Sequence, residues 1–248
     1  DLLKVKYSYD ISDNQMFIAS YLSEKYSKYY YYPYYYSNGQ YIVNPEEFVN
    51  GVLDREEINL YYNINNLDYK RLIGLELYDE DYSSYNIYYP DNSILQESIF
   101  DGQDKTENSN NISLYFYEER SIGSNVLSGG LRWLSSEDII LPSLSYMLEG
   151  PDNYNFRFSY SSGYRSPSIK EKYYKWEDHA GPDIIGNQDL RPTKNNYFSI
   201  SLDKRSSIND FSVDLYRNDI SDMISTEYDE NGDLVYKNFD NVLISGIN

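Results

Sequence analysis

Residues 154–162 read YNFRFSYSS, and large side chains alternate with polar ones along the whole stretch. One face of an extended strand would carry Tyr154, Phe156, Phe158 and Tyr160, and the other would carry Asn155, Arg157, Ser159 and Ser161. A period of two places successive side chains on opposite faces of a sheet, whereas a helix needs a period of about 3.6. The stretch therefore predicts a β-strand with one aromatic face and one polar face.

The same alternation recurs along the chain. Apolar residues occupy every second position in 198–202 and 211–215, and the polar residues 204–209 between these runs predict an antiparallel hairpin. Less regular versions comprise Leu3, Val5, Tyr7 and Tyr9; Ile58, Leu60, Tyr62 and Ile64; Ile73, Leu75 and Leu77; Leu114 and Phe116; and Leu127, Leu131 and Trp133. We expect an all-β fold built from antiparallel strands of one design.

Composition agrees with strands and excludes several partners and sites. The chain has 32 tyrosines, and its only alanines are Ala19 and Ala180, so it lacks the best helix former. A formal net charge of -19 argues against nucleic acid as a partner, because phosphate binding needs clustered Lys and Arg. The absence of cysteine excludes disulfides, thiolate metal sites and thiol nucleophiles.

Two β architectures suit this pattern. A soluble sandwich needs an apolar interior, and its inward faces would carry more Val, Leu and Ile than these strands do. A membrane barrel has lipid outside, polar groups inside and aromatic belts at both interfaces. No apolar run approaches the ~20 residues of a membrane helix, so a membrane-spanning form would have to be a closed barrel. We expect an antiparallel transmembrane β-barrel.

A tyrosine-rich segment keeps an alternative open. Tyr29 to Tyr32 and Tyr34 to Tyr36 flank Pro33, and we place this run on a loop or at a strand end. Its rings are either interfacial residues or a stacking surface for a flat or glycan-like ligand. The alternative function is a soluble or surface-attached glycan-binding β-domain that uses such tyrosine platforms.

Two short boxes bracket a long loop after the strand at residues 154–162. The first is Gly163-Tyr164-Arg165-Ser166-Pro167-Ser168, and the second is Gly186-Asn187-Gln188-Asp189-Leu190-Arg191-Pro192. Glycine tolerates close backbone approach, and proline ends ladder pairing because it has no amide hydrogen. Long loops of membrane barrels lie on the extracellular side. We expect the next strand near Phe198.

The order and spacing of these boxes resemble the barrel of TonB-dependent outer-membrane receptors. The downstream segment agrees, since residues 216–220 end a strand, and Asn238 and Gly246 sit where the family begins and continues the next one. The resemblance implies a receptor in the outer membrane of a diderm bacterium. It would actively import an iron chelate such as haem or a siderophore, with energy from the TonB complex. Outer-membrane lipid and a surface lipoprotein are the further partners that it implies.

The loop also supplies the candidate ligand-binding residues. The chain's single histidine, His179, lies close in sequence to Tyr173, Tyr174 and Trp176. The resemblance includes haem receptors, in which such a histidine can ligate haem iron while aromatic rings stack on the porphyrin. The family boxes add Tyr164, Arg165, Asn187 and Asp189 as candidate ligand contacts. Ser166 replaces the usual alanine and Gln188 the usual proline, and siderophore receptors share much of the same framework. His179 is otherwise an ordinary loop histidine, and both boxes could serve only to shape the loop.

The chain is expected to be one partial barrel over residues 1–248. At about ten residues per strand plus connections it supplies roughly ten to twelve strands, whereas plugged transporters of this kind use about 22. No plug domain or energy-coupling box is recognisable in it. We therefore interpret it as a fragment of a larger, plugged barrel.

We expect no enzyme, no catalytic residues and no required cofactor. One histidine and no cysteine leave no catalytic thiol pair, and no serine elbow or glycine-rich phosphate loop is present. A glycosidase would need two carboxylates, but no pattern brings a particular pair together. Asp229, Asn231 and Asp233 have calcium-loop spacing, yet Gly232 is misplaced and no glutamate closes the loop.

Overall fold

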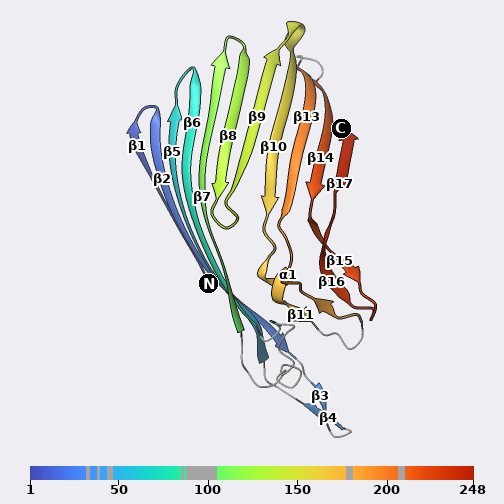
Figure 1. Ribbon diagram of the computed structural model, residues 1–248. Coiled ribbons are helices and arrows are strands. Elements are labelled where there is room, and N and C mark those ends of the chain that lie inside the picture. Colours follow the sequence, from blue (N-terminus) through green and yellow to red (C-terminus); the bar gives the residue numbers. More distant parts are fainter. Residues whose placement is uncertain are drawn as a thin grey trace.

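The structure, a computed structural model, describes residues 1–31, 34–37, 40–43, 47–84, 87, 105–176, 181–205 and 210–248. Its main element is an 11-stranded sheet that runs from β1 to β17 (Figure 1). In spatial order the strands are β1 (Leu2–Ser12), β2 (Gln15–Tyr31), β5 (Glu47–Asn65), β6 (Tyr69–Ser84), β7 (Lys105–Ile122), β8 (Asn125–Leu134), β9 (Ile139–Glu149), β10 (Tyr154–Arg165), β13 (Thr193–Arg205), β14 (Asp210–Ser221) and β17 (Val242–Ile247).

Every neighbouring pair in this sheet is antiparallel, which confirms the all-β antiparallel prediction. The hairpin expected around residues 204–209 is the β13–β14 pair, whose connecting residues 206–209 are outside the described part. β13 begins at Thr193, directly after Pro192, instead of near Phe198. Asn238 was expected to begin the next barrel strand, but it belongs to a separate hairpin, and β17 begins at Val242.

The two ends of the sheet differ. At the short-turn end, tight connections such as Asp13-Asn14 and Gly123-Ser124 join successive strands, and a one-turn 3-10 helix, η2 (Pro151–Asn153), joins β9 to β10. At the loop end lie the hairpin of β3 (Tyr34–Ser37) and β4 (Gln40–Val43), the helix α1 (Ile169–Tyr173), and a second sheet (Figure 1). That second sheet contains β11 (Lys175–Trp176), β12 (Ile184–Ile185), β16 (Leu234–Phe239) and β15 (Met223–Tyr228).

Register places most of the apolar residues of the strands on one face, which we call the apolar face. Phe158 is opposite Tyr146 on β9 and Ile200 on β13, and Ile200 is in turn opposite Leu215 on β14. The face continues to the first strands, where Leu60 is opposite both Ala19 and Leu75. Many of its side chains are exposed, including Val5, Ile73, Leu114, Leu131, Leu144, Phe158 and Ile200.

The opposite face, the polar face, carries Ser, Asn, Glu, Arg and Tyr side chains. Ser145 and Ser159 hydrogen-bond across β9 and β10, and Glu24 and Arg55 form an ion pair across β2 and β5. Among the described residues, buried hydrophobic side chains are few: Tyr82, Ile87, Leu134, Ile169, Leu190 and Ile224. A sheet that exposes its apolar side needs another apolar phase to cover it, and lipid hydrocarbon is such a phase. The described residues contain no helix that is both long and apolar enough to cross a membrane.

One glycine on the polar face is required by a close approach. Gly74 on β6 lies directly opposite Tyr115 on β7, and a Cβ on Gly74 would be 2.0 Å from Cζ of Tyr115. The tyrosine ring therefore covers the bare backbone of the glycine, a device that pins the register of neighbouring strands. A second tyrosine, Tyr61, lies 5.8 Å from Tyr115 between ring centroids.

Candidate functional site

The first box forms a fixed corner at the loop end of β10. Arg165 Nη1 donates to both carboxylate oxygens of Glu171, at 3.0 and 2.9 Å. Glu171 also accepts the backbone N–H of Ser168 at 2.8 Å, while Ser168 Oγ accepts the N–H of Glu171, so the pair forms a capping box at the start of α1. Burial alone would raise the pKa of Glu171, but the hydrogen bonds from Arg165 and Ser168 outweigh burial and lower that pKa.

The second box ties the same loop to the β15–β16 hairpin. Asn187 Nδ2 donates to the carbonyl oxygen of Tyr236 at 3.1 Å, and Asn187 Oδ1 accepts the N–H of Asp189 at 2.9 Å. Asn238 accepts from the N–H of Arg191 at 2.7 Å and donates back to the carbonyl oxygen of Arg191 at 2.8 Å. Both boxes therefore shape the loop, and residues far apart in the sequence share one folded unit at the loop end of the sheet.

Replacing Asn187 with alanine tests this structural role. The change removes two hydrogen bonds inside the folded loop, so we expect it to cost about 1–2 kcal/mol of local stability. Hydrogen exchange of the amides in 184–190 should become roughly ten times faster, and the β-sheet should stay intact. Gln188→Ala, at an exposed neighbouring position, is the matched control and should leave exchange unchanged. Equal exchange in the two variants would contradict a clamping role for Asn187.

The loop also packs onto a distant strand, β6, at the loop end of the sheet. Ile169 on α1 is buried against Tyr82 of β6 and Ile87, and Tyr173 and Tyr174 pack around this cluster. Ile87 forms a bridge with Tyr174, and Lys170 Nζ lies 5.0 Å from the centroid of the Tyr82 ring. Burial raises the pKa of the Tyr173 hydroxyl, with a smaller contribution from Glu107. The contact therefore connects the loop after β10 with β6. Between these two strands lie β7, β8 and β9, and the connection from β8 to β9 at this end is short.

The candidate ligand contacts thus have different surroundings. Arg165 and Asn187 are engaged within the protein, and Tyr173 and Tyr174 pack in the apolar cluster, each with part of its surface accessible. Tyr164 is half-buried at the end of β10, and Asp189 is exposed. The backbone of Trp176 belongs to β11, and His179 lies outside the described residues. Ligand contact by any of them stays a prediction.

The segment whose spacing suggested a calcium loop forms a hydrogen-bonded turn. Asp229 Oδ1 accepts the N–H groups of Asn231 and Asp233, each at 2.9 Å, and these bonds close the turn between β15 and β16. The backbone hydrogen bond from Asp233 is the main reason that the pKa of Asp229 is lowered. The part of the chain that the structure describes contains no group of three or more His, Cys, Asp or Glu side chains that could hold a metal ion.

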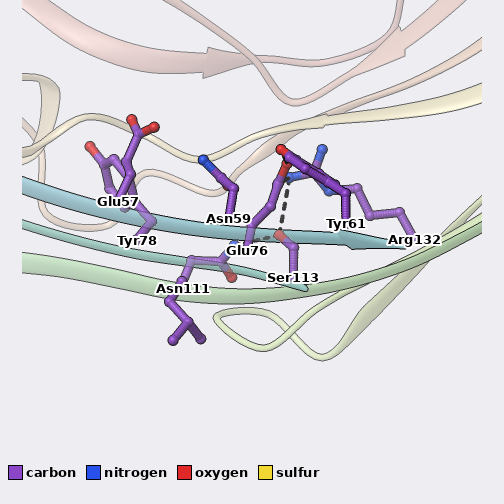
Figure 2. A pocket seen from close by; sticks show the side chains of 9 residues that line it. Glu57, Asn59, Tyr61, Glu76, Tyr78, Asn111, Ser113 and Arg132 are labelled. Carbon is purple, nitrogen blue, oxygen red and sulfur yellow. Dashed lines mark hydrogen bonds and ion pairs between the residues drawn. The ribbon is translucent and has the colours of Figure 1, made fainter. Parts of the chain in front are cut away.

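A second candidate region lies on the polar face of β5 to β8 and was not singled out from the sequence. Arg132 Nη2 donates to Glu76 Oε2 at 2.5 Å and to Ser113 Oγ at 3.0 Å (Figure 2). These side chains line a concavity of about 360 Å³ together with Glu57, Asn59, Tyr61, Leu77, Tyr78 and Asn111. We call it the wall concavity. In the sequence its residues are scattered over four strands, and the only available signal was that nearly all of them fall on the polar side of the alternation.

The comparison with known families bears on both regions. The sequence matches the family described as TonB dependent receptor-like, beta-barrel over residues 1–248. The chain belongs to the TonB-dependent receptor family. No curated protein matches its sequence significantly.

Solved receptors share the fold at low sequence identity. The ferric enterobactin receptor PfeA of Pseudomonas aeruginosa superposes with a TM-score of 0.73 at 13% identity, covering 99% of this chain and 40% of the receptor. The siderophore receptor PirA of Acinetobacter baumannii gives 0.68 at 16% identity, with 99% and 41% covered. The copper transporter OprC gives 0.68 at 14% identity, with 99% and 42% covered. The chain therefore spans about two-fifths of these receptors.

Membership in the family explains what each of the two faces of the sheet contacts. TonB-dependent receptors are outer-membrane receptors of Gram-negative bacteria, and they work with TonB rather than as enzymes. In such a barrel the apolar face contacts lipid, and the polar face lines the interior. The wall concavity is then part of the inner wall, and the loop that carries both boxes lies at one mouth.

Proposed function

We propose that this chain forms part of an outer-membrane receptor that imports an iron chelate, either haem or a siderophore, with energy from the TonB complex. The observation that carries this proposal is the sheet with one lipid-compatible face and one polar face, in a chain that belongs to the TonB-dependent receptor family. The siderophore receptors among its structural neighbours favour this cargo class. The receptor would act in the outer membrane of a diderm bacterium.

The barrel's role in import would be physical. The loop at the mouth holds tyrosine rings and charged groups in fixed positions, which suits an initial binding surface for a large, flat or multidentate chelate. The inner wall carries both positive and negative side chains, as in the contact of Arg132 with Glu76. A polar cargo could therefore pass along it without being held by an excess of one charge. The barrel itself does no covalent chemistry.

The exposed apolar face argues against the glycan-binding alternative. A soluble β-domain buries its apolar side chains between sheets, but here Leu144, Ile140 and Phe158 are exposed at 55%, 61% and 45%. Tyr29 to Tyr31 are the last residues of β2, and Tyr34 to Tyr36 lie in β3. A surface lipoprotein partner remains a proposal that follows only from the family resemblance.

Import can be tested by growth on a single iron source. A strain that lacks the full-length receptor should regain growth on haem, or on a ferric siderophore, when the gene is restored, and only if TonB is present. Absorbance titration of the purified receptor with haem should then be compared between the parent and His179→Ala, with Glu230→Ala as a loop control. A Soret shift that weakens only in His179→Ala assigns haem, and growth on a siderophore without any shift assigns that class. Growth on neither source, or growth without TonB, would contradict the proposal.

A further inference from the structure

Two arginines stand at the short-turn end of the apolar face, at the border of the apolar band. Arg71 Nη2 lies 2.6 Å from Glu118 Oε2, and Arg120 Nε also donates to the Glu118 carboxylate. Both guanidinium groups lie near the ring of Tyr69, at 5.4 Å for Arg71 and 6.0 Å for Arg120, measured to the ring centroid. We call Tyr69, Arg71, Glu118 and Arg120 the arginine patch.

The patch carries a net positive charge. Two guanidinium groups share the single carboxylate of Glu118, so one positive charge is left uncompensated within the patch. The side chain of Arg120 is 59% exposed, whereas that of Glu118 is 17% exposed, so the accessible surface is cationic. Arg120 binds Glu118 through Nε, which leaves its two terminal nitrogens free of any hydrogen bond to other described residues. A guanidinium fork of this kind matches the geometry of a phosphate group.

The same face has the opposite character at the loop end. There Asp54 lies directly opposite Asp81 on β5 and β6, and Glu56 lies opposite Asp79. Among the described residues at this position, these four carboxylates face the single cation Lys25, which pairs with Asp54. The chain as a whole has a formal charge of -19, so a cationic patch on it stands apart from the general trend. Charge on the apolar face is therefore polarised between its two ends.

Exposed apolar residues lie directly beside the arginine patch, and they indicate that the patch lies at the edge of a lipid phase. Phe116 is the next residue along the apolar face of β7, Leu127 lies opposite Arg120 on β8, and Ile73 is the next on β6. All three are exposed, at 41%, 38% and 46% respectively. A molecule whose acyl chains cover these residues would place its head group against Arg71 and Arg120. In membrane barrels the short turns lie on the periplasmic side, where the leaflet consists of phospholipid.

We propose that the arginine patch binds the phosphate of a phospholipid in the periplasmic leaflet, with the acyl chains lying on Phe116, Leu127 and Ile73. Arg120 provides the exposed donors, Arg71 is held in place by Glu118, and Tyr69 supports both guanidinium groups. A related contact occurs further along the same border, where Lys204 Nζ lies 3.1 Å from Tyr154 Oη and 4.3 Å from the Tyr154 ring centroid. This binding is independent of the imported cargo.

The test is native mass spectrometry of the full-length receptor in detergent, titrated with phosphatidylglycerol. We expect one tightly held lipid on the parent, and a loss of affinity of about fivefold for each arginine replaced, so that R71Q/R120Q binds roughly 25-fold more weakly. Arg217→Gln is the matched control, because Arg217 is exposed on the same face toward the loop end, and its charge is balanced one-to-one by Asp219, to which its Nε donates. Diacylglycerol, which lacks the phosphate, should not form the adduct.

Any of the following outcomes would overturn the inference. Equal lipid affinity in the parent and R71Q/R120Q would remove the arginines from the site, and an equal loss in Arg217→Gln would indicate non-specific attraction. Displacement of the lipid by millimolar inorganic phosphate would mean that a free anion, not a lipid, is recognised. Heat-modifiable migration on gels checks folding, and R120Q alone replaces the double variant if that variant misfolds, since Arg71 and Glu118 then remain paired. Uptake of the iron chelate should be unchanged in R120Q.

Discussion

Leu144→Arg should destabilise the inserted barrel, because it places a charge on the lipid-facing side in the middle of the apolar band. Leu144 is 55% exposed on β9 and lies opposite Gly129 and Tyr160, so more than half of its surface is uncovered by protein. An arginine near the middle of a bilayer on a barrel surface costs about 2–4 kcal/mol. Equilibrium urea unfolding of the full-length receptor in lipid vesicles should report a loss of that size in the free energy of unfolding.

The adjacent residue provides the control for this prediction. Ser145 precedes Tyr146 on the same strand but lies on the polar face, where it hydrogen-bonds with Ser159. Ser145→Arg removes that bond, at a cost of about 1 kcal/mol, but leaves its charge in the polar interior. It should therefore unfold at clearly higher urea than Leu144→Arg. The reverse order would mean that the two faces have been assigned the wrong way round.

Glu171→Gln should release the loop between the two boxes. The carboxylate of Glu171 accepts bonds from Arg165 and from Ser168, and hydrogen bonds to charged groups are worth about 1.5–3 kcal/mol. Glutamine keeps the size of the side chain but removes the charge. Proteolysis within residues 166–192 should become roughly tenfold faster or more, while heat-modifiable migration of the barrel on gels stays normal. Glu230→Ala, at an exposed position in the β15–β16 turn, should have no effect.

This contribution should also depend on pH in a defined direction. The pKa of Glu171 is lowered in the folded loop, because hydrogen bonds from Arg165 and Ser168 outweigh its burial. The stabilisation is therefore complete above the ordinary pKa of a glutamate and is lost as the pH falls through the lowered value in the folded state. Loop proteolysis by an acid-active protease should accelerate over that interval in the parent but stay flat in Glu171→Gln. Parallel profiles in the two proteins would contradict the assignment.

Much of the sheet could be predicted from the sequence, because the side-chain period of two fixes which residues share a face. Phe156, Phe158 and Tyr160 were assigned to one face, and register places them opposite Leu202, Ile200 and Phe198. The same reasoning held for the weaker segments, such as Leu114 and Phe116, which lie opposite Leu75 and Ile73. Alternation over several strands is a local property, and lipid on one side enforces it in every strand.

The folded unit at the mouth could not be predicted in the same way. Its second sheet joins Ile184 and Ile185 in parallel to Leu234 and Val235, a pairing between segments far apart in the sequence. Such pairings carry no periodic signal, and the family resemblance assigned Asn238 to a barrel strand instead. The contact of Arg132 with Glu76 was missed for a related reason, since β8 and β6 are brought together only through β7.

The most direct test of the central claim is quenching of a fluorescent label by brominated lipid acyl chains along β9 and β10. This chain contains no cysteine, so single cysteine variants within it can each carry one label. In the full-length receptor, labels at Leu144 and Phe158 should be strongly quenched, and labels at Ser145 and Arg157 should be quenched weakly, because the two pairs lie on opposite faces. Equal quenching at all four positions, or stronger quenching at Ser145 and Arg157, would contradict a barrel with its apolar face in lipid.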